Sequence, residues 1–86
     1  MPEIKWSLLK NERLKKVRGV SFEEILDARL IDIRKHPNKE HQNLMLFDYQ
    51  DYIWVVPYIA VGKDIFLKTL YPSRKYTKLY KRGELQ

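Results

Sequence analysis

The sequence predicts an α+β fold made of two N-terminal helices, a four-stranded antiparallel sheet and a C-terminal helix. Three observations support this prediction. Apolar residues recur with helical spacing over residues 7–29, they alternate with polar ones over much of 30–71, and helical spacing returns after residue 74. Helices followed by a run of strands are typical of an antiparallel sheet covered by helices. A chain of 86 residues is short enough for a single domain spanning 1–86.

The N-terminal segment begins with a short extended stretch over residues 4–6, followed by a helix over 7–18. At about 3.6 residues per turn, one side of this helix gathers Trp6, Leu9, Arg13, Leu14 and Val17. Gly19 follows a basic last turn and accepts the positive φ that ends many helices.

The second helix begins at a capping box, in which the Ser21 hydroxyl and the Glu24 carboxylate each bind the other residue's backbone amide. Val20 and Ile25 flank this box as an apolar pair. We expect this helix to run from residue 22 to about 29, close against the first.

Four strands follow, over residues 30–35, 44–49, 52–60 and 65–71. Turn residues separate them at 36–38, 50–51 and 61–64. Pro57 lacks a backbone N–H and therefore predicts an edge position or a bulge in the third strand. Ser73 is placed to cap a last helix over 74–81.

The charge distribution suggests an acidic partner. The chain has 17 Lys and Arg against 11 Asp and Glu, a net charge of +6, and the excess lies in residues 1–18 and 74–86. If both ends pack on one side of the domain, they form one basic patch suited to phosphates. The alternative is a solvated surface with a disordered basic tail.

Several classes of function are excluded or disfavoured. The chain has no cysteine, so it forms no disulfide and no thiol site. Three scattered glycines make no phosphate-binding loop, and two histidines five residues apart in a loop predict no metal site and no cofactor. The longest apolar run, residues 53–61, is far shorter than the roughly 20 residues that cross a bilayer. We therefore expect a cytoplasmic protein without membrane contact.

The remaining Lys, Arg, Tyr and His side chains suit metal-free cleavage of RNA. In that reaction the 2′-hydroxyl attacks the neighbouring phosphate while a base removes its proton, cations stabilise the added charge, and an acid protonates the leaving 5′-oxygen. We expect Lys68 and Arg74 to stabilise the phosphate, and His36 or Tyr58 to transfer a proton. The candidates for holding the RNA backbone are Lys10, Lys15, Lys16, Arg18, Lys75 and Lys78.

Each candidate also has a purely structural interpretation. Lys68 shares strand parity with Phe66, so it is either an anion-binding group or an amine that extends to solvent at the sheet margin. Arg74 stands at a helix start, where free amides favour phosphate, or simply at a solvated helix end. His36 is otherwise a loop residue, and Tyr58 a core or rim aromatic.

The sequence resembles the BrnT-like toxins of bacterial toxin–antitoxin modules. The resemblance rests on residues 5–12 (KWSLLKNE) and 18–25 (RGVSFEEI), and on the later segments 36–38, 54–58 and 66–75. Lys10 matches a basic residue of the family signature. Ser7, Leu14 and Arg18 stand where the signature has an acidic residue, an asparagine and a histidine, and Phe66 stands in place of its arginine.

The resemblance implies a RelE-like fold, ribonuclease activity that blocks translation on free or ribosome-bound mRNA, and neutralisation by a small DNA-binding antitoxin. Our leading hypothesis is a metal-independent mRNA endoribonuclease. Two alternatives stay open. One is a non-enzymatic module that binds nucleic acid or a partner protein, and the other is a toxin that targets gyrase. Cleavage of RNA in EDTA separates the first alternative from the enzyme.

Overall fold

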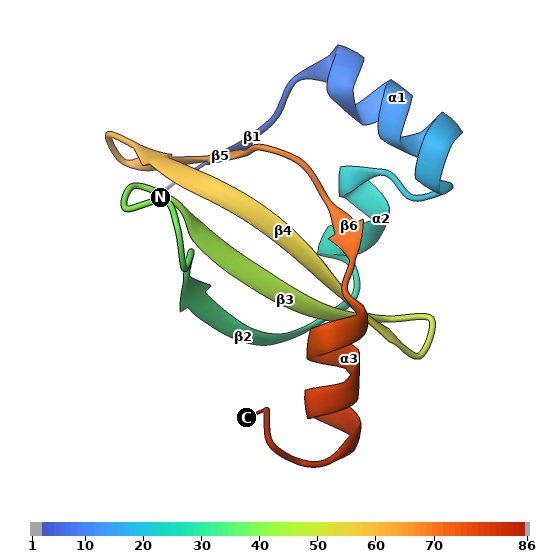
Figure 1. The fold of residues 1–86 in the computed structure, drawn as a ribbon. Helices are drawn as coiled ribbons and strands as arrows, with labels where there is room; N and C mark the ends of the chain where they lie inside the picture. Colours follow the sequence, from blue (N-terminus) through green and yellow to red (C-terminus); the bar gives the residue numbers. More distant parts are fainter. Residues whose placement is uncertain (1–2, 86) are drawn as a thin grey trace.

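The computed structural model describes residues 3–85 and has the α+β architecture that the sequence predicts (Figure 1). Its elements, in chain order, are β1 (Ile4–Lys5), α1 (Leu8–Arg18), α2 (Phe22–Leu26), β2 (Arg29–Lys35), β3 (Asn43–Tyr49), β4 (Tyr52–Val61), β5 (Asp64–Leu67), β6 (Tyr71–Pro72) and α3 (Arg74–Lys81).

The sheet has six strands in the described residues, so the expected number of four is wrong. The expected antiparallel meander is present as β2, β3, β4 and β5. Two short strands extend it, because β1 pairs parallel with β5 and β6 pairs antiparallel with β4. Strand β4 therefore lies in the middle of the sheet, and β2 forms one free edge.

The capping signals predicted at Gly19, at Ser21 with Glu24 and at Ser73 are confirmed, while Ser7, expected inside the first helix, is its N-cap. Ser7 accepts a hydrogen bond from the Lys10 amide at the start of α1, and Gly19 ends that helix with φ 76°. The reciprocal capping box of Ser21 and Glu24 starts α2, and the Ser73 hydroxyl caps α3. Helix α2 ends at Leu26, earlier than expected, because the extended backbone of β2 already begins three residues later.

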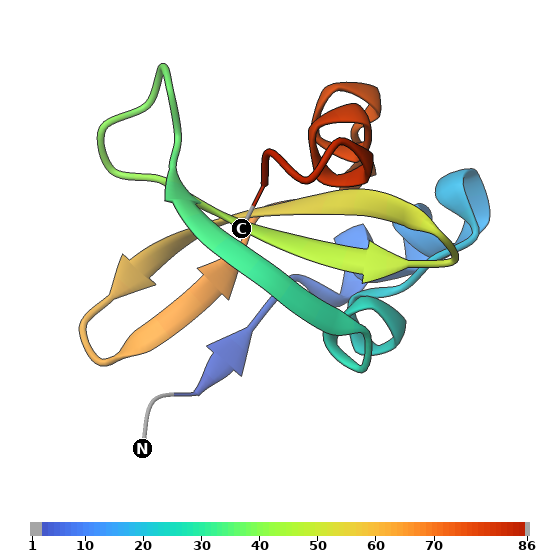
Figure 2. The same ribbon diagram turned by 90° about the horizontal axis from the view of Figure 1, so that it is seen from below.

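Two separate apolar cores lie on opposite faces of the sheet, since successive strand residues point to opposite sides. The first core consists of Leu14, Val20, Phe22, Ile25, Met45, Phe47, Trp54, Val56, Tyr58, Leu67 and Leu70. The second core consists of Leu44, Leu46, Ile53, Val55 and Leu85, with residues of α3 packed against it. Figure 2 shows α3 on one side of the sheet and α2 on the other.

The apolar side predicted for α1 does not form a continuous buried face. Leu14 is buried in the first core, but Leu9 and Val17 are 79% and 73% exposed. Helix α1 is instead fastened to the start of α2 by polar contacts. The Asn11 side chain accepts from the Phe22 amide at 2.7 Å and donates to Glu23 at 2.6 Å. Within residues 3–85, one flank of α1 thus remains uncovered.

Pro57 occupies the central strand, so the expected edge position or bulge is wrong. Its carbonyl accepts a hydrogen bond from the Lys68 amide at 2.8 Å. In a strand the N and C=O of one residue point the same way, so the missing N–H of Pro57 faces the gap between β5 and β6 rather than β3. A proline is tolerated there because no ladder bond is lost.

The expected single strand over residues 65–71 is divided by the same gap. Leu67 and Leu70 are both buried in the first core. Their spacing of three residues does not fit the two-residue period of a strand, so the chain leaves the ladder after Leu67. It resumes as β6, where Tyr71 pairs with Val55.

Candidate nucleic-acid interface

The two basic ends of the chain form separate surfaces. Helix α1 belongs to the first core through Leu14, whereas α3 packs on the second core through Tyr76, Leu79 and Tyr80. Figure 1 shows the two helices at opposite ends of the molecule. The condition for a single basic patch is therefore not met, and each end has to be considered on its own.

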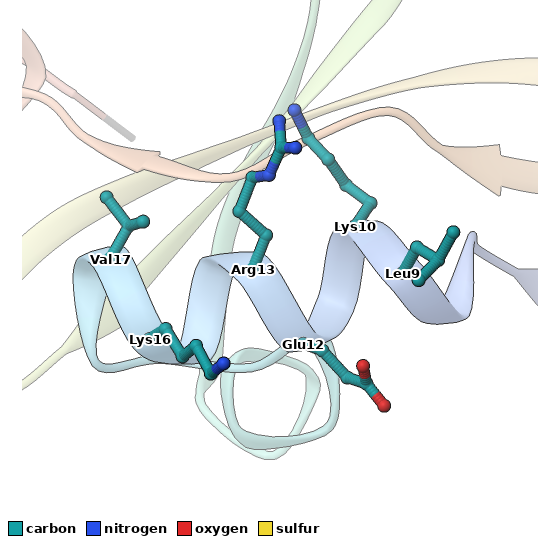
Figure 3. Close-up of a pocket in the computed structure, with 6 residues that line it drawn as sticks. All are labelled: Leu9, Lys10, Glu12, Arg13, Lys16 and Val17. Carbon is teal, nitrogen blue, oxygen red and sulfur yellow. The ribbon is translucent and has the colours of Figure 1, made fainter.

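The surface of α1 combines cations with exposed apolar groups. An open hollow of about 470 Å³ is lined by Leu9, Lys10, Glu12, Arg13, Lys16 and Val17. Figure 3 shows Lys10 and Arg13 projecting to the same side of the helix, away from Glu12. Two of the expected RNA-binding lysines, Lys10 and Lys16, therefore border one hollow.

Two other expected RNA-binding residues lie elsewhere on α1. The Lys15 ammonium binds the Glu24 carboxylate at 2.7 Å and approaches the Gly19 carbonyl at 3.5 Å. This hydrogen bond, more than any other contact, holds the pKa of Glu24 below its usual value. Lys15 thus fastens the helix end, while Arg18 is exposed in the last turn.

A second cationic hollow lies on the surface of α3. It has a volume of about 410 Å³ and is lined by Arg74, Lys75, Lys78, Leu79 and Arg82. Four of these five side chains are cations, so the hollow favours an anion. It contains the expected RNA-binding residues Lys75 and Lys78, together with Arg74.

Lys68 and Arg74 were expected to converge on one phosphate. The structure places Lys68 just beyond the end of β5, with an exposed side chain, and Arg74 at the first position of α3. Lys68 does not line the hollow that contains Arg74. Lys68 was expected to lie within a continuous strand to residue 71, but that strand ends at Leu67.

The imidazole of His36 closes the loop between β2 and β3. Its Nδ1 atom accepts hydrogen bonds from the backbone amides of Asn38 at 3.0 Å and Lys39 at 3.1 Å. A base at Nε2 requires the proton on Nδ1, and an acid requires protons on both atoms. Proton transfer by His36 therefore competes with the two hydrogen bonds that shape its loop.

The other proton-transfer candidate, Tyr58, is part of the first core and only 9% exposed. Burial raises the pKa of its phenol. The Tyr58 hydroxyl therefore stays protonated at neutral pH, which suits a hydrogen-bond donor better than a base.

A further cluster of side chains was not predicted from the sequence. The guanidinium of Arg34, on β2, and the ammonium of Lys75, on α3, each lie 5.7 Å from the ring centroid of Tyr76. The Arg34 Nε atom donates to Asp32 at 2.8 Å. The sequence offered one signal, because alternate residues of a strand face the same side of the sheet and so place Asp32 beside Arg34. Tyr76 lies far along the chain and gave no such signal.

Metal and membrane features are not found in the part of the chain that the structure describes. Residues 3–85 contain no group of three or more His, Cys, Asp or Glu side chains placed to hold a metal ion. None of the helices in the same range has the length and apolar character needed to span a bilayer.

Comparison with known proteins gives a structural relative. No protein family model and no curated protein sequence matches the chain. The fold is similar to the crystal structure of the Brucella abortus ribonuclease toxin BrnT, with a TM-score of 0.58 and 18% sequence identity, covering 85% of this chain and 97% of that one. The chain therefore has a BrnT-like fold, in agreement with its sequence resemblance.

Proposed function

We propose that this protein is the toxin of a toxin–antitoxin pair and acts as a metal-independent endoribonuclease on mRNA in the cytoplasm. The observation that carries the proposal is the BrnT-like fold, because the structural relative is a ribonuclease toxin and the match spans most of both chains. The cationic hollows on α1 and α3 support it, since both favour the phosphates of RNA.

The proposed chemistry needs cations at the phosphate and groups that transfer protons. Lys68 and Arg74 are both exposed and free to contact a substrate. Of the proton-transfer candidates, Tyr58 is limited to donating by its burial, and His36 by its loop contacts. Mutagenesis of each residue therefore tests its proposed role separately, by the loss of activity.

The proposed partner is a small DNA-binding antitoxin encoded beside this protein. Its binding requires surface that the toxin leaves free. The edge strand β2 exposes 47% of Leu30 and 51% of Ile33, and α1 exposes Leu8, Leu9 and Val17 beside its cations. An acidic, amphipathic antitoxin segment complements this apolar and basic surface.

Induced expression in a bacterial host, followed by RNA sequencing of cleavage ends, tests the proposal. We expect growth arrest, and we expect the purified protein to cleave RNA in EDTA. Lys68→Met and Arg74→Gln each remove a cation proposed to act on transition-state charge, so activity falls by about 100- to 1,000-fold, by analogy with an oxyanion-hole donor. Lys63→Gln, in the β4–β5 turn, is the matched control. Full activity of both folded variants contradicts the proposed site.

A second function is favoured by one observation. The Nδ1 atom of His36 accepts from two backbone amides of its loop, and burial raises the pKa of the Tyr58 phenol, so neither side chain is set up as a general base. A BrnT-like fold that binds nucleic acid without cleaving it agrees with this arrangement. Intact RNA that co-purifies with the protein, without cleavage after prolonged incubation, identifies this binding module.

A further inference from the structure

Tyr76 is the centre of a small cationic cluster built from two elements. The Arg34 guanidinium carbon and the Lys75 ammonium nitrogen are equally distant from its ring centroid, at 5.7 Å. The two cations therefore lie within twice that distance of each other. Residues from β2 and α3 meet here because both contribute to the face of the sheet that carries the second core.

The geometry of Arg34 leaves part of its guanidinium for a ligand. Its Nε–H is used by the Asp32 carboxylate at 2.8 Å, and the hydrogen bond from Arg34 is the main cause of the lowered pKa of Asp32. Among residues 3–85, no other hydrogen bond of the Arg34 guanidinium is found. Asp32 thus orients the group while the two Nη atoms keep their donors.

The cluster carries more positive charge than it neutralises. Within the described range, Asp32 is the one carboxylate paired with Arg34, and Lys75 has no carboxylate within ion-pair distance. Lys75 also lines the α3 hollow together with Arg74, Lys78 and Arg82. Lys75 is therefore common to the Tyr76 cluster and to the α3 hollow.

We infer that Arg34, Lys75 and Tyr76 form a phosphodiester-binding site for single-stranded RNA, with the rest of the strand running along the α3 hollow. This inference rests on the proposed function and deepens it by choosing the α3 face over the α1 face. The planar guanidinium fork suits two phosphate oxygens, Lys75 adds a second charge, and the ring of Tyr76 holds both cations beside it.

The test measures binding of a short single-stranded oligoribonucleotide whose 2′-hydroxyls are O-methylated, so that it cannot be cleaved. Lys75→Gln and Arg34→Gln should each weaken binding by about fivefold, the upper value for one exposed ion pair. Each should also flatten the dependence of log affinity on log salt by about 0.7. Lys63→Gln removes the same charge from the β4–β5 turn and should change neither quantity.

Two results overturn the inference. One is an unchanged affinity and salt slope in both Lys75→Gln and Arg34→Gln. The other is a loss confined to Lys16→Gln, which assigns the RNA to α1. Because Lys75 is exposed and pairs with no carboxylate among residues 3–85, its variant keeps the fold and the test stays decisive. Failure of the unmodified protein to cleave ordinary RNA refutes the proposed function but leaves this binding result standing.

Discussion

Replacement of Thr77 by valine tests how α3 is fixed to the sheet. The buried Thr77 hydroxyl accepts a hydrogen bond from the Ile53 amide at 2.9 Å and donates to the Ser73 carbonyl at 2.6 Å. The Ser73 amide in turn donates to the Ile53 carbonyl at 2.8 Å. These hydrogen bonds fix the first turn of α3 to β4.

The expected loss of stability comes from the Ile53 N–H, which loses its hydrogen-bond acceptor. Valine preserves the shape but leaves the Ile53 N–H without an acceptor in a residue that is 0% exposed. The Ser73 carbonyl keeps its bond from the Thr77 backbone amide at 3.1 Å. An unsatisfied buried donor costs about 1–3 kcal/mol, and for a domain of this size each kcal/mol lowers Tm by roughly 4–8 °C.

Thermal unfolding and amide hydrogen exchange measure this effect. We expect Thr77→Val to lower Tm and to speed exchange of the Ile53 amide, because the donor loses its acceptor. Thr77→Ser keeps the hydroxyl and is the control, and its Ile53 amide should stay protected. A Thr77→Val protein with unchanged Tm and a protected Ile53 amide would refute the reasoning.

Three further predictions concern α1 and the His36 loop. Leu14→Ala should lower the free energy of unfolding by about 2–5 kcal/mol, whereas Val17→Ala, on the exposed flank, should change it by no more than about 0.5 kcal/mol. Denaturant titrations measure both values, and equal losses would show that the flank is packed. Because the pKa of Glu24 is lowered in the folded protein, its bond to Lys15 stabilises the fold above the usual carboxyl pKa. This stabilisation is lost as the pH falls through the pKa of Glu24 in the folded protein. Acidification should therefore destabilise Glu24→Gln less than the unmodified protein. His36→Asn keeps an oxygen acceptor for the loop amides, so RNA cleavage should persist if His36 is structural, whereas a fall of about 100- to 10,000-fold would establish proton transfer.

The elements that the sequence predicted well are those with local signals. Ser21 and Glu24 satisfy each other's amides within one turn, and Gly19 needs only its own backbone freedom to end a helix. The burial of α1 was predicted wrongly because periodicity defines a face without showing what covers it. Pro57 was predicted wrongly because the edge rule assumes continuous neighbouring strands, and here the neighbour is interrupted.

The candidate site was predicted less completely for a related reason. The basic residues of α3 were expected to bind RNA, and the structure gathers Arg74, Lys75 and Lys78 around one hollow. Arg34 was missed because its importance depends on Tyr76, a residue brought near only by the packing of α3 on the sheet. Contacts between distant parts of the chain leave no spacing pattern to detect.

The parallel pairing of β1 with β5 has a consequence for the order of folding. Ile4 lies opposite Ile65, so this contact closes a loop that contains most of the chain. The β2–β3 and β3–β4 pairings join neighbouring segments and need far less loop closure. We expect the meander to assemble first and the N-terminal strand to dock last, so that slow refolding phases report on β1 rather than on the hairpins.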